Sequence, residues 1–218
     1  MNEGPILISL KTSIISTIIV TMLGIGLANI LLKGRGKFKG IIESAIMLPL
    51  FMPPSLIGYI LLLVVGKRSF IGSFLYENFD FSFVFSWYGA VIAAVITALP
   101  IMYGSAKGAL LSIDDTYKDI AADLGATKFQ TFYKVTLPLA FKGILSGMVL
   151  SFARCFGEFG ATMMIAGNIP GKTQNIPMAI YYAVENGQTS KANFLAVIVI
   201  IVSTTLIFIY NRLLKDDK

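Results

Sequence analysis

The sequence predicts an all-α integral membrane protein with about five transmembrane helices. Hydrophobic residues make up 56% of its 218 residues and charged residues only 14%, and the mean hydropathy is +0.77. Five apolar runs approach or exceed the roughly 20 residues that a helix needs to cross a bilayer; they cover residues 6–32, 41–65, 87–106, 143–166 and 192–210. No segment outside these runs is long enough to form a soluble domain, so we expect one membrane domain over residues 1–218.

The first two runs each carry a feature that bears on how they cross the membrane. Run 6–32 is too long, and too poor in small residues at a cleavage position, to be a removed signal peptide. Run 41–65 is interrupted by Pro49, Pro53 and Pro54. Proline removes an N–H donor and kinks a helix, which lipid tolerates only where neighbours or cavity water satisfy the freed carbonyls. Either a packing kink or a bend that shapes a passage fits these prolines.

A polar segment at residues 114–142, within a loop of about 108–142, separates the third and fourth runs. Tyr117, Ile120, Ala121 and Leu124 follow the i, i+3, i+4, i+7 spacing of one helix face. Acidic residues crowd the amino-terminal end of this helix, and Gly125 is expected to end it. A second helical stripe follows; its members are Phe129, Phe132 and Tyr133, before the pair Leu137 and Pro138. Two short helices on one aqueous face of a membrane protein are typical of a binding surface for a soluble partner.

The basic residues predict the orientation, because cytoplasmic loops carry an excess of Lys and Arg. Twelve of the eighteen lie in the first connection, in the polar segment with its flanks, or in the tail. They are Lys33, Arg35, Lys37, Lys39, Lys107, Lys118, Lys128, Lys134, Lys142, Arg212, Lys215 and Lys218. We therefore expect an outer amino terminus, with the polar segment and the carboxyl terminus in the cytoplasm. Topology thus accounts for the net charge of +6 without a nucleic-acid partner.

The fourth run contains small residues at helical spacing. Gly143 and Gly147 are four apart, as are Gly157 and Ala161. Small residues at this spacing let helix backbones approach closely in a membrane. We therefore expect tight helix contacts at both pairs.

The same run contains two charges, Arg154 and Glu158, which are also four apart and can meet on one helix face. Unpaired charges at this depth are costly, so the two should pair with each other or face water. One interpretation is a structural ion pair that locks helices or subunits together. The other is that both side chains line a polar passage, where Arg154 meets an anion transiently. The sequence leaves both open.

Residues 166–173, AGNIPGKT, fit a relaxed phosphate-loop pattern. A phosphate loop follows a strand and cradles phosphates with successive N–H groups. Here a membrane run precedes the pattern and Pro170 removes one of those N–H groups, so we expect an ordered outer loop instead. Residues 176–184 are too short to span and predict a re-entrant or surface helix, in which Met178, Tyr181 and Tyr182 serve packing.

The chain lacks the side chains that several classes of enzyme require. The chain has no histidine, which excludes imidazole metal sites and Ser-His or Cys-His nucleophile pairs. Cys155 is the only cysteine, so no internal disulfide forms, and we expect it to be a small packing residue.

The polar segment resembles the cytoplasmic signature loop of ABC-importer permeases, whose pattern is Glu-Ala-Ala, three residues, Gly, nine residues, then Ile-x-Leu-Pro. The spacing is met throughout, with Asp for Glu, Ile for the first Ala and Val for Ile. The matching positions are Asp119, Ile120, Ala121, Gly125, Val135, Leu137 and Pro138. The resemblance implies a type I ABC-importer permease fold, in which these residues and Leu124 form a coupling helix and its flank that seat in a separate cytoplasmic ATPase.

Residues 151–181 are similar to the permeases of molybdate transporters, whose run is close to FARxxGEFGATxxxxGNIPGxTxTxPxAIY; Asn175 stands where Thr is usual. This resemblance implies a homodimeric permease in a prokaryotic inner membrane, in contact with membrane lipid. Its partners would be cytoplasmic ATPase subunits, which use ATP and Mg²⁺, and an outer oxyanion-binding protein. The permease itself would bind no cofactor and catalyse no reaction. The candidate passage residues are Arg154, Glu158, Thr162, Pro53 and Pro54.

Alternatives remain at two levels. Within the importer class, tungstate or sulfate is the alternative cargo. Outside it, an ion-driven secondary transporter would usually show repeated halves and broken helices at the midplane, and no internal repeat is evident in this sequence. A membrane-embedded enzyme or a scaffold is a further alternative, for which catalytic side chains are lacking.

Overall fold

The computed structural model describes residues 4–34 and 36–215, and every regular element within these ranges is helical. The all-α prediction is therefore confirmed over the described chain. Three unbroken helices are long and apolar enough to cross a membrane; these segments are Pro5–Leu32, Trp87–Leu111 and Thr189–Leu214. Two bent helix pairs raise the count to as many as five if each pair is one span, which agrees with the expected number.

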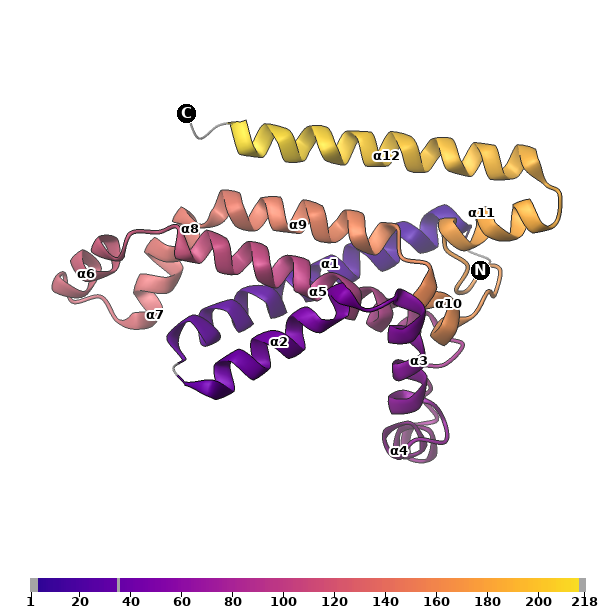
Figure 1. The fold of residues 1–218 in the computed structure, drawn as a ribbon, viewed down its shortest axis with the longest axis horizontal. Helices are drawn as coiled ribbons and strands as arrows, with labels where there is room; N and C mark the ends of the chain where they lie inside the picture. Colours follow the sequence, from indigo (N-terminus) through magenta and orange to yellow (C-terminus); the bar gives the residue numbers. More distant parts are fainter. Residues whose placement is uncertain (1–3, 35, 216–218) are drawn as a thin grey trace.

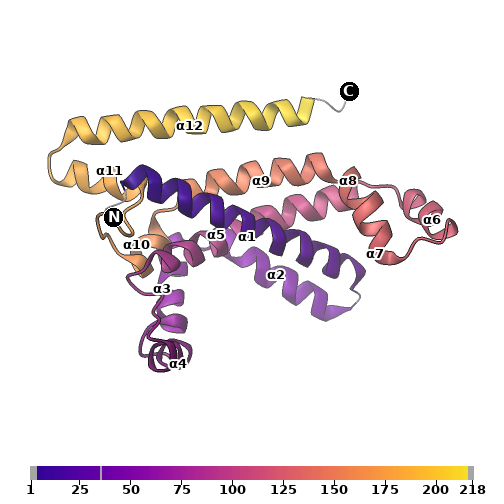
Figure 2. The same cartoon turned by 180° about the vertical axis from the view of Figure 1, so that it is seen from behind.

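Helices α1 (Pro5–Lys33), α5 (Trp87–Leu111) and α9 (Phe141–Phe156) form the centre of the bundle, and run beside one another in Figures 1 and 2. Small residues set their spacing. A Cβ added at Gly143 would lie 2.6 Å from Ala109 Cβ, and one at Gly147 would lie 2.5 Å from Ser105 Cβ. The expected tight contact at the first glycine pair is thus confirmed. Cys155 is buried in this core, as expected of a packing residue.

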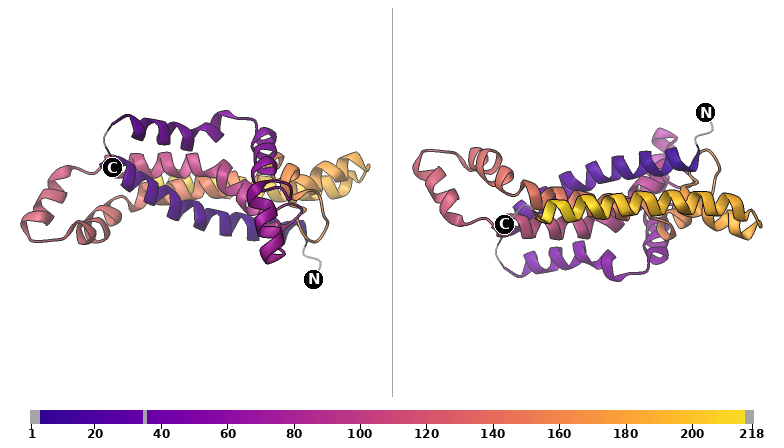
Figure 3. Two further views of the ribbon diagram at one scale, coloured as in Figure 1. Left: turned by 90° about the horizontal axis from the view of Figure 1, so that it is seen from below. Right: turned by 90° about the horizontal axis from the view of Figure 1, so that it is seen from above.

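The second apolar run is interrupted, as its prolines predict, but it forms two separate helices and not one bent span over 41–65. Helix α2 (Lys37–Phe51) lies beside α5 and ends before Met52, and α3 (Pro54–Val65) begins two residues later. Figures 1 and 3 show α3 turning away from α2 toward α4 (Phe70–Phe79). Pro53 and Pro54 supply no N–H donors, so a helix cannot continue through them. Pro49 lies inside α2 without ending it.

The fourth run is broken as well, so a continuous span over 143–166 is also wrong. Helix α9 ends at Phe156, and the short α10 (Gly160–Ala166) follows after three residues. Gly157 therefore lies outside both helices, and the expected pairing of Gly157 with Ala161 on one helix face does not occur. Ala161 instead packs against α3, where a Cβ added at Gly58 would lie 2.8 Å from Ala161 O.

The last two helices complete the fold. Residues 176–184 form most of α11 (Ile176–Glu185), in which Met178 is buried and Tyr181 is exposed. Helix α12 (Thr189–Lys215) packs on α9 and α11 and leaves much of its apolar surface uncovered. Its carboxyl end lies at the same end of the molecule as α6 (Asp115–Asp123) and the α1–α2 junction, whereas the amino end of α1 lies at the other (Figure 1).

Candidate functional site

The polar segment forms a helix that is capped at both ends. Asp114 precedes α6, and its Oδ1 accepts hydrogen bonds from Thr116 N–H at 2.8 Å and from Thr116 Oγ1 at 2.6 Å. These two bonds favour the carboxylate and lower the pKa of Asp114. Asp115 adds a second acidic residue in the first turn, where negative charge complements the helix dipole.

Gly125 follows the end of α6, as the sequence predicts. Its φ of +79° is a left-handed conformation that side chains other than glycine adopt only with strain. The Gly125 N–H donates to Ala122 O at 2.9 Å, and the Ala126 N–H donates to Ala121 O at 2.9 Å. Together these bonds form a Schellman motif, which satisfies carbonyls left free at the helix end.

The predicted apolar face of α6 divides into a packed edge and an exposed stripe. Ala121 is 7% exposed, since α6 packs on the following helices α7 (Lys128–Thr131) and η1 (Phe132–Thr136). The rest of the face remains uncovered: Tyr117 is 53% exposed, Ile120 52% and Leu124 83%. Asp119 is exposed beside this stripe. An apolar stripe at the tip of a polar segment is suited to a cleft in another protein.

The second stripe connects this tip to the membrane helices. Thr127 and Gln130 form a capping box at the start of α7, and the rings of Phe129 and Tyr133 lie 4.5 Å apart. Helix η1 is a wide π-turn, closed by the Leu137 N–H donating to Phe132 O. The short α8 (Leu137–Leu139) then bends by 69° into α9. Val135 and Leu137 are partly buried and Pro138 is exposed, so this flank is joined to the bundle.

Arg154 and Glu158 pair, but not on one helix face. Arg154 lies in the last turn of α9, and Glu158 lies in the break before α10. Arg154 Nη1 is 2.8 Å from Glu158 Oε2, and Glu158 Oε1 accepts a 2.8 Å hydrogen bond from the Ala161 N–H. The Glu158 side chain is 1% exposed, whereas that of Arg154 is 29% exposed. One carboxylate oxygen is therefore hydrogen-bonded to the backbone and the other lies against the arginine as an ion pair; of the two side chains, only that of Arg154 is partly exposed.

Asn175 ties the same break to α11. Its Nδ2 donates to Glu158 O at 2.6 Å, and its Oδ1 accepts from the Met178 N–H at 3.1 Å. The next residue, Ile176, donates its N–H to Ser9 Oγ of α1 at 2.8 Å. Asn175, which stands where Thr is usual, thus supplies a side-chain amide that links the break before α10 to the start of α11.

The N–H groups of the glycine-rich loop, residues 167–174, donate hydrogen bonds within the loop. The N–H groups of Lys172, Thr173 and Gln174 all point to Ile169 O, at 2.9–3.1 Å. Thr173 Oγ1 donates to Gly167 O at 2.7 Å and is buried. The loop follows helix α10 and not a strand, so the expectation of an ordered loop in place of a phosphate loop is confirmed.

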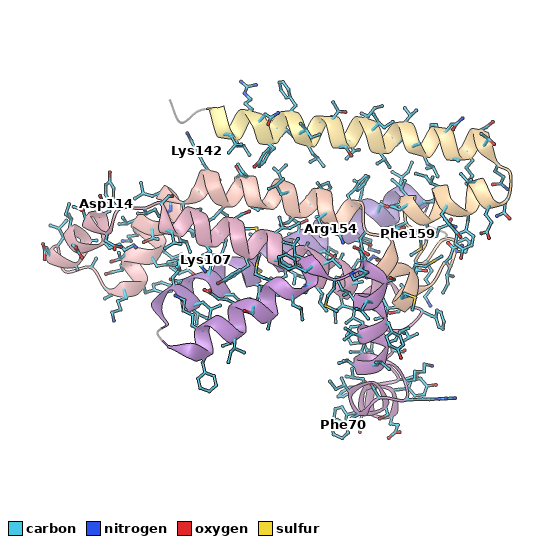
Figure 4. All side chains as sticks on the ribbon, viewed as in Figure 1. Phe70, Lys107, Asp114, Lys142, Arg154 and Phe159 are labelled. Carbon is cyan, nitrogen blue, oxygen red and sulfur yellow. The ribbon has the colours of Figure 1, made fainter. Side chains whose placement is uncertain are left out.

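The structure brings the candidate passage residues of two runs together. A Cβ on Gly160 would lie 3.1 Å from Pro54 Cβ, so the start of α3 packs against the start of α10. Thr162, the third residue of α10, is 1% exposed and is therefore not accessible in this conformation. Pro53 and Pro54 are exposed. Figure 4 shows Arg154 near the middle of the bundle and Asp114 at its far end, so the two sets of candidate residues form separate sites.

A second polar cluster was not predicted. Glu43 Oε1 of α2 accepts from Tyr103 Oη and from Lys107 Nζ of α5, each at 2.9 Å. Glu43 is the one acidic residue of the second run, and Tyr103 and Lys107 are four apart. Those two signals point to a polar contact, but the sequence does not indicate that α2 packs on α5. Among residues 4–34 and 36–215, no three His, Cys, Asp or Glu side chains gather as metal ligands.

Comparison with known proteins agrees with this arrangement. The model of the family described as binding-protein-dependent transport system inner membrane component matches residues 20–215. The molybdenum transport system permease protein ModB of Escherichia coli (strain K12) is 40% identical over 214 residues, covering 98% of this chain and 93% of that protein. The putative molybdenum transport system permease protein YvgM of Bacillus subtilis is 39% identical and covers 95% and 92%.

Solved structures share the fold at low sequence identity. A chain of a bacterial alginate ABC transporter, in complex with an alginate pentasaccharide-bound periplasmic protein, superposes with a TM-score of 0.77 at 15% identity, over 97% of this chain and 77% of that chain. A chain of the inward-facing MetNI methionine ABC transporter gives 0.73 at 16% identity, over 96% and 92%. The fold is that of ABC-importer permeases, and the apolar helices make this a multi-pass inner-membrane protein. The chain belongs to the family of binding-protein-dependent transport system inner membrane components.

Proposed function

We propose that this chain is the permease subunit of an ATP-driven importer that carries molybdate into the cytoplasm. The observation that carries the proposal is the identity of about 40% to molybdenum transport permeases over nearly the whole chain. The motif of residues 151–181 supports it, because Glu158, which matches the pattern of molybdate permeases, accepts the Ala161 N–H bond that holds the start of α10. Tungstate and sulfate are the alternative cargoes.

A divalent oxyanion cannot cross hydrocarbon unaided, since stripping its water costs on the order of tens of kcal/mol. The permease therefore provides a water-filled route that opens to one side at a time. Arg154 is the cation that meets the anion in this route, because its guanidinium has five N–H donors and Glu158 Oε2 occupies one nitrogen. Glu158 is buried beside the Ala161 N–H and acts by positioning the arginine. Weak, transient contact suits transport, because tight binding would oppose release.

In this proposal the exposed stripe Tyr117, Ile120 and Leu124 seats in a cleft of a cytoplasmic ATPase. Closure of the ATPase on ATP and Mg²⁺ moves α6, and the capped turns of α7 and η1 pass that movement to α9. Two copies of the chain surround the route, and an outer oxyanion-binding protein delivers the ion. The amino terminus then lies outside and the carboxyl terminus in the cytoplasm.

The direct test is uptake into sealed vesicles that hold the permease with its ATPase and present the loaded binding protein outside. Molybdate accumulation should require internal ATP and should survive an uncoupler of ion gradients. Uptake that the uncoupler abolishes while ATP is present would instead indicate a secondary transporter. Equal or stronger uptake of sulfate would reassign the cargo.

Gly125→Val tests the coupling surface. Valine at a φ of +79° carries a strain of about 1–2 kcal/mol and displaces the end of α6. We expect loss of ATP-driven uptake from a chain that still inserts. Gly187→Val is the matched control, since Gly187 also has a positive φ of +69° and open space around it, but lies at the other end of the bundle. Equal uptake by the two variants would contradict the coupling role of α6.

A further inference from the structure

Two adjoining grooves lie between α1 and the segment that follows α6. The first has a volume of about 430 Å³; most of its lining is apolar, and we call it the polar groove only because Lys118 and Thr131 lie in it. The second, the apolar groove, has a volume of about 570 Å³ and is lined by Met22, Ile25 and Ile30 among others. Three residues line both grooves; they are Asn29, Lys128 and Phe132. The grooves therefore form one elongated depression that is mainly apolar, with Lys118 in one part and Lys128 where the two parts meet.

The junction of the two grooves carries a cation. Lys128 Nζ makes no ion pair or hydrogen bond with any residue in the described ranges. Lys118, in the polar groove, is held by Asp115 at 2.7 Å, but this pair is exposed and weak. An anionic group is the complementary occupant of the polar groove.

The apolar groove exposes side chains that suit a hydrocarbon neighbour. Met22 is 72% exposed and Ile30 65%, both in the membrane helix α1, and Phe129 of α7 is 70% exposed. Gly26 leaves room beside them, because a Cβ built at this position meets no atom within 4 Å. An alkyl chain that lies along α1 would cover these side chains.

The exposed stripe of α6 does not line either groove: the lining residues of α6 are Lys118 and Ala122, whereas Tyr117 and Ile120 lie elsewhere on the helix. A protein that covers the stripe therefore leaves the grooves open. Basic pockets beside transmembrane helices bind anionic lipid headgroups on the cytoplasmic side. We propose that one anionic phospholipid occupies both grooves, with its phosphate beside Lys128 and an acyl chain along Met22, Gly26 and Ile30.

Native mass spectrometry of the full chain, titrated with phosphatidylglycerol or with phosphatidylcholine of the same acyl chains, tests the headgroup. The chain should retain phosphatidylglycerol preferentially, and Lys128→Gln should weaken that binding about fivefold, as removal of one lysine from a lipid surface does. Lys134→Gln is the matched control, because Lys134 lies in the neighbouring turn and outside both grooves. Equal affinities for the two lipids, or equal loss in the two variants, would overturn the proposal.

Gly26→Leu tests the acyl chain, since a Cβ at this position meets no atom within 4 Å and a longer side chain extends into the groove. It should take the place of part of the acyl chain and weaken phosphatidylglycerol binding in the same titration. Gly40→Leu, which is also unobstructed but lies on α2, should change nothing. If glycerophosphoglycerol without acyl chains binds as tightly as the lipid, the occupant is a free phosphate. If the variants alter subunit stoichiometry and leave lipid binding intact, the depression is a protein interface. Either result refutes the lipid assignment.

Discussion

The pair Arg154 and Glu158 gives the sharpest test of the structure, because its two members differ in exposure. Glu158 is 1% exposed and Arg154 29%. Removing one partner of a buried pair costs about 3–5 kcal/mol, since the other charge is left uncompensated. Arg154→Met leaves the buried carboxylate without its partner, whereas Glu158→Gln leaves the partly exposed guanidinium without its partner. Arg154→Met should therefore be the more destabilising change.

The size of each effect follows from the contacts. For Arg154→Met we expect a loss of about 4 kcal/mol, near the middle of that range. Glu158→Gln keeps an oxygen that can accept from the Ala161 N–H and leaves only the partly exposed guanidinium without its partner. We therefore expect a loss of about 2 kcal/mol of unfolding free energy. Glu158→Ala also removes that acceptor and should cost about 1 kcal/mol more than the glutamine variant. The double variant Arg154→Met/Glu158→Gln should recover at least about 1 kcal/mol relative to the sum of the single changes.

The measurement is the free energy of unfolding of the purified full chain in mixed micelles, with uptake assayed in parallel. Lys191→Met is the control, because Lys191 is an exposed cation and its loss should stay within about 0.5 kcal/mol. Additive single effects, or a glutamine variant less stable than the methionine variant, would refute the pairing described here. Normal stability with lost uptake in Arg154→Lys would identify the arginine as a contact for the anion.

Three further predictions follow from other contacts. Gly147→Val places a Cβ 2.5 Å from Ser105 Cβ and should lower the free energy of unfolding by about 1–3 kcal/mol in the same assay. Unchanged stability would mean that α5 and α9 lie further apart. The bonds from Thr116 lower the pKa of Asp114, so the stabilisation from this cap is complete above the unfolded-state pKa and is lost as the pH falls through the lower folded-state pKa. The amide chemical shift of Thr116 should follow that titration, and Asp114→Asn should remove it; a midpoint at or above the ordinary aspartate pKa would contradict the cap. Glu43→Ala removes the acceptor that a tyrosine and a lysine of α5 share, which should lower the free energy of unfolding by about 1–3 kcal/mol. Glu43→Gln keeps an acceptor oxygen and should cost less. Equal effects of the two variants would show that the shared acceptor is unimportant.

Local features of the sequence predicted the parts of the fold that depend on neighbouring residues. The acidic start of α6 and its end beside Gly125 follow from interactions within one helix and its caps, so spacing alone identified them. Gly143 and Gly147 correctly indicated a close helix contact, because a missing side chain allows close approach whatever the partner is. The partner, α5, was not indicated by the sequence.

Hydropathy predicted membrane helices but not where they break. Apolar content is the same for a straight span and for two helices joined by a turn, so run 143–166 looked continuous; in run 41–65 the prolines indicated an interruption, but not that the two parts form separate helices. The break before α10 is possible because its free polar groups find partners: the Ala161 N–H donates to Glu158 Oε1, and Asn175 Nδ2 donates to Glu158 O. Such partners lie up to 17 positions away in the chain, and the contact of Glu43 with Lys107 spans 64. Composition and periodicity therefore determined that this chain crosses a membrane and carries a polar segment with a short amphipathic helix, and the prolines determined where α2 gives way to α3. Long-range hydrogen bonds and packing decided how the chain breaks before α10 and which helices lie side by side.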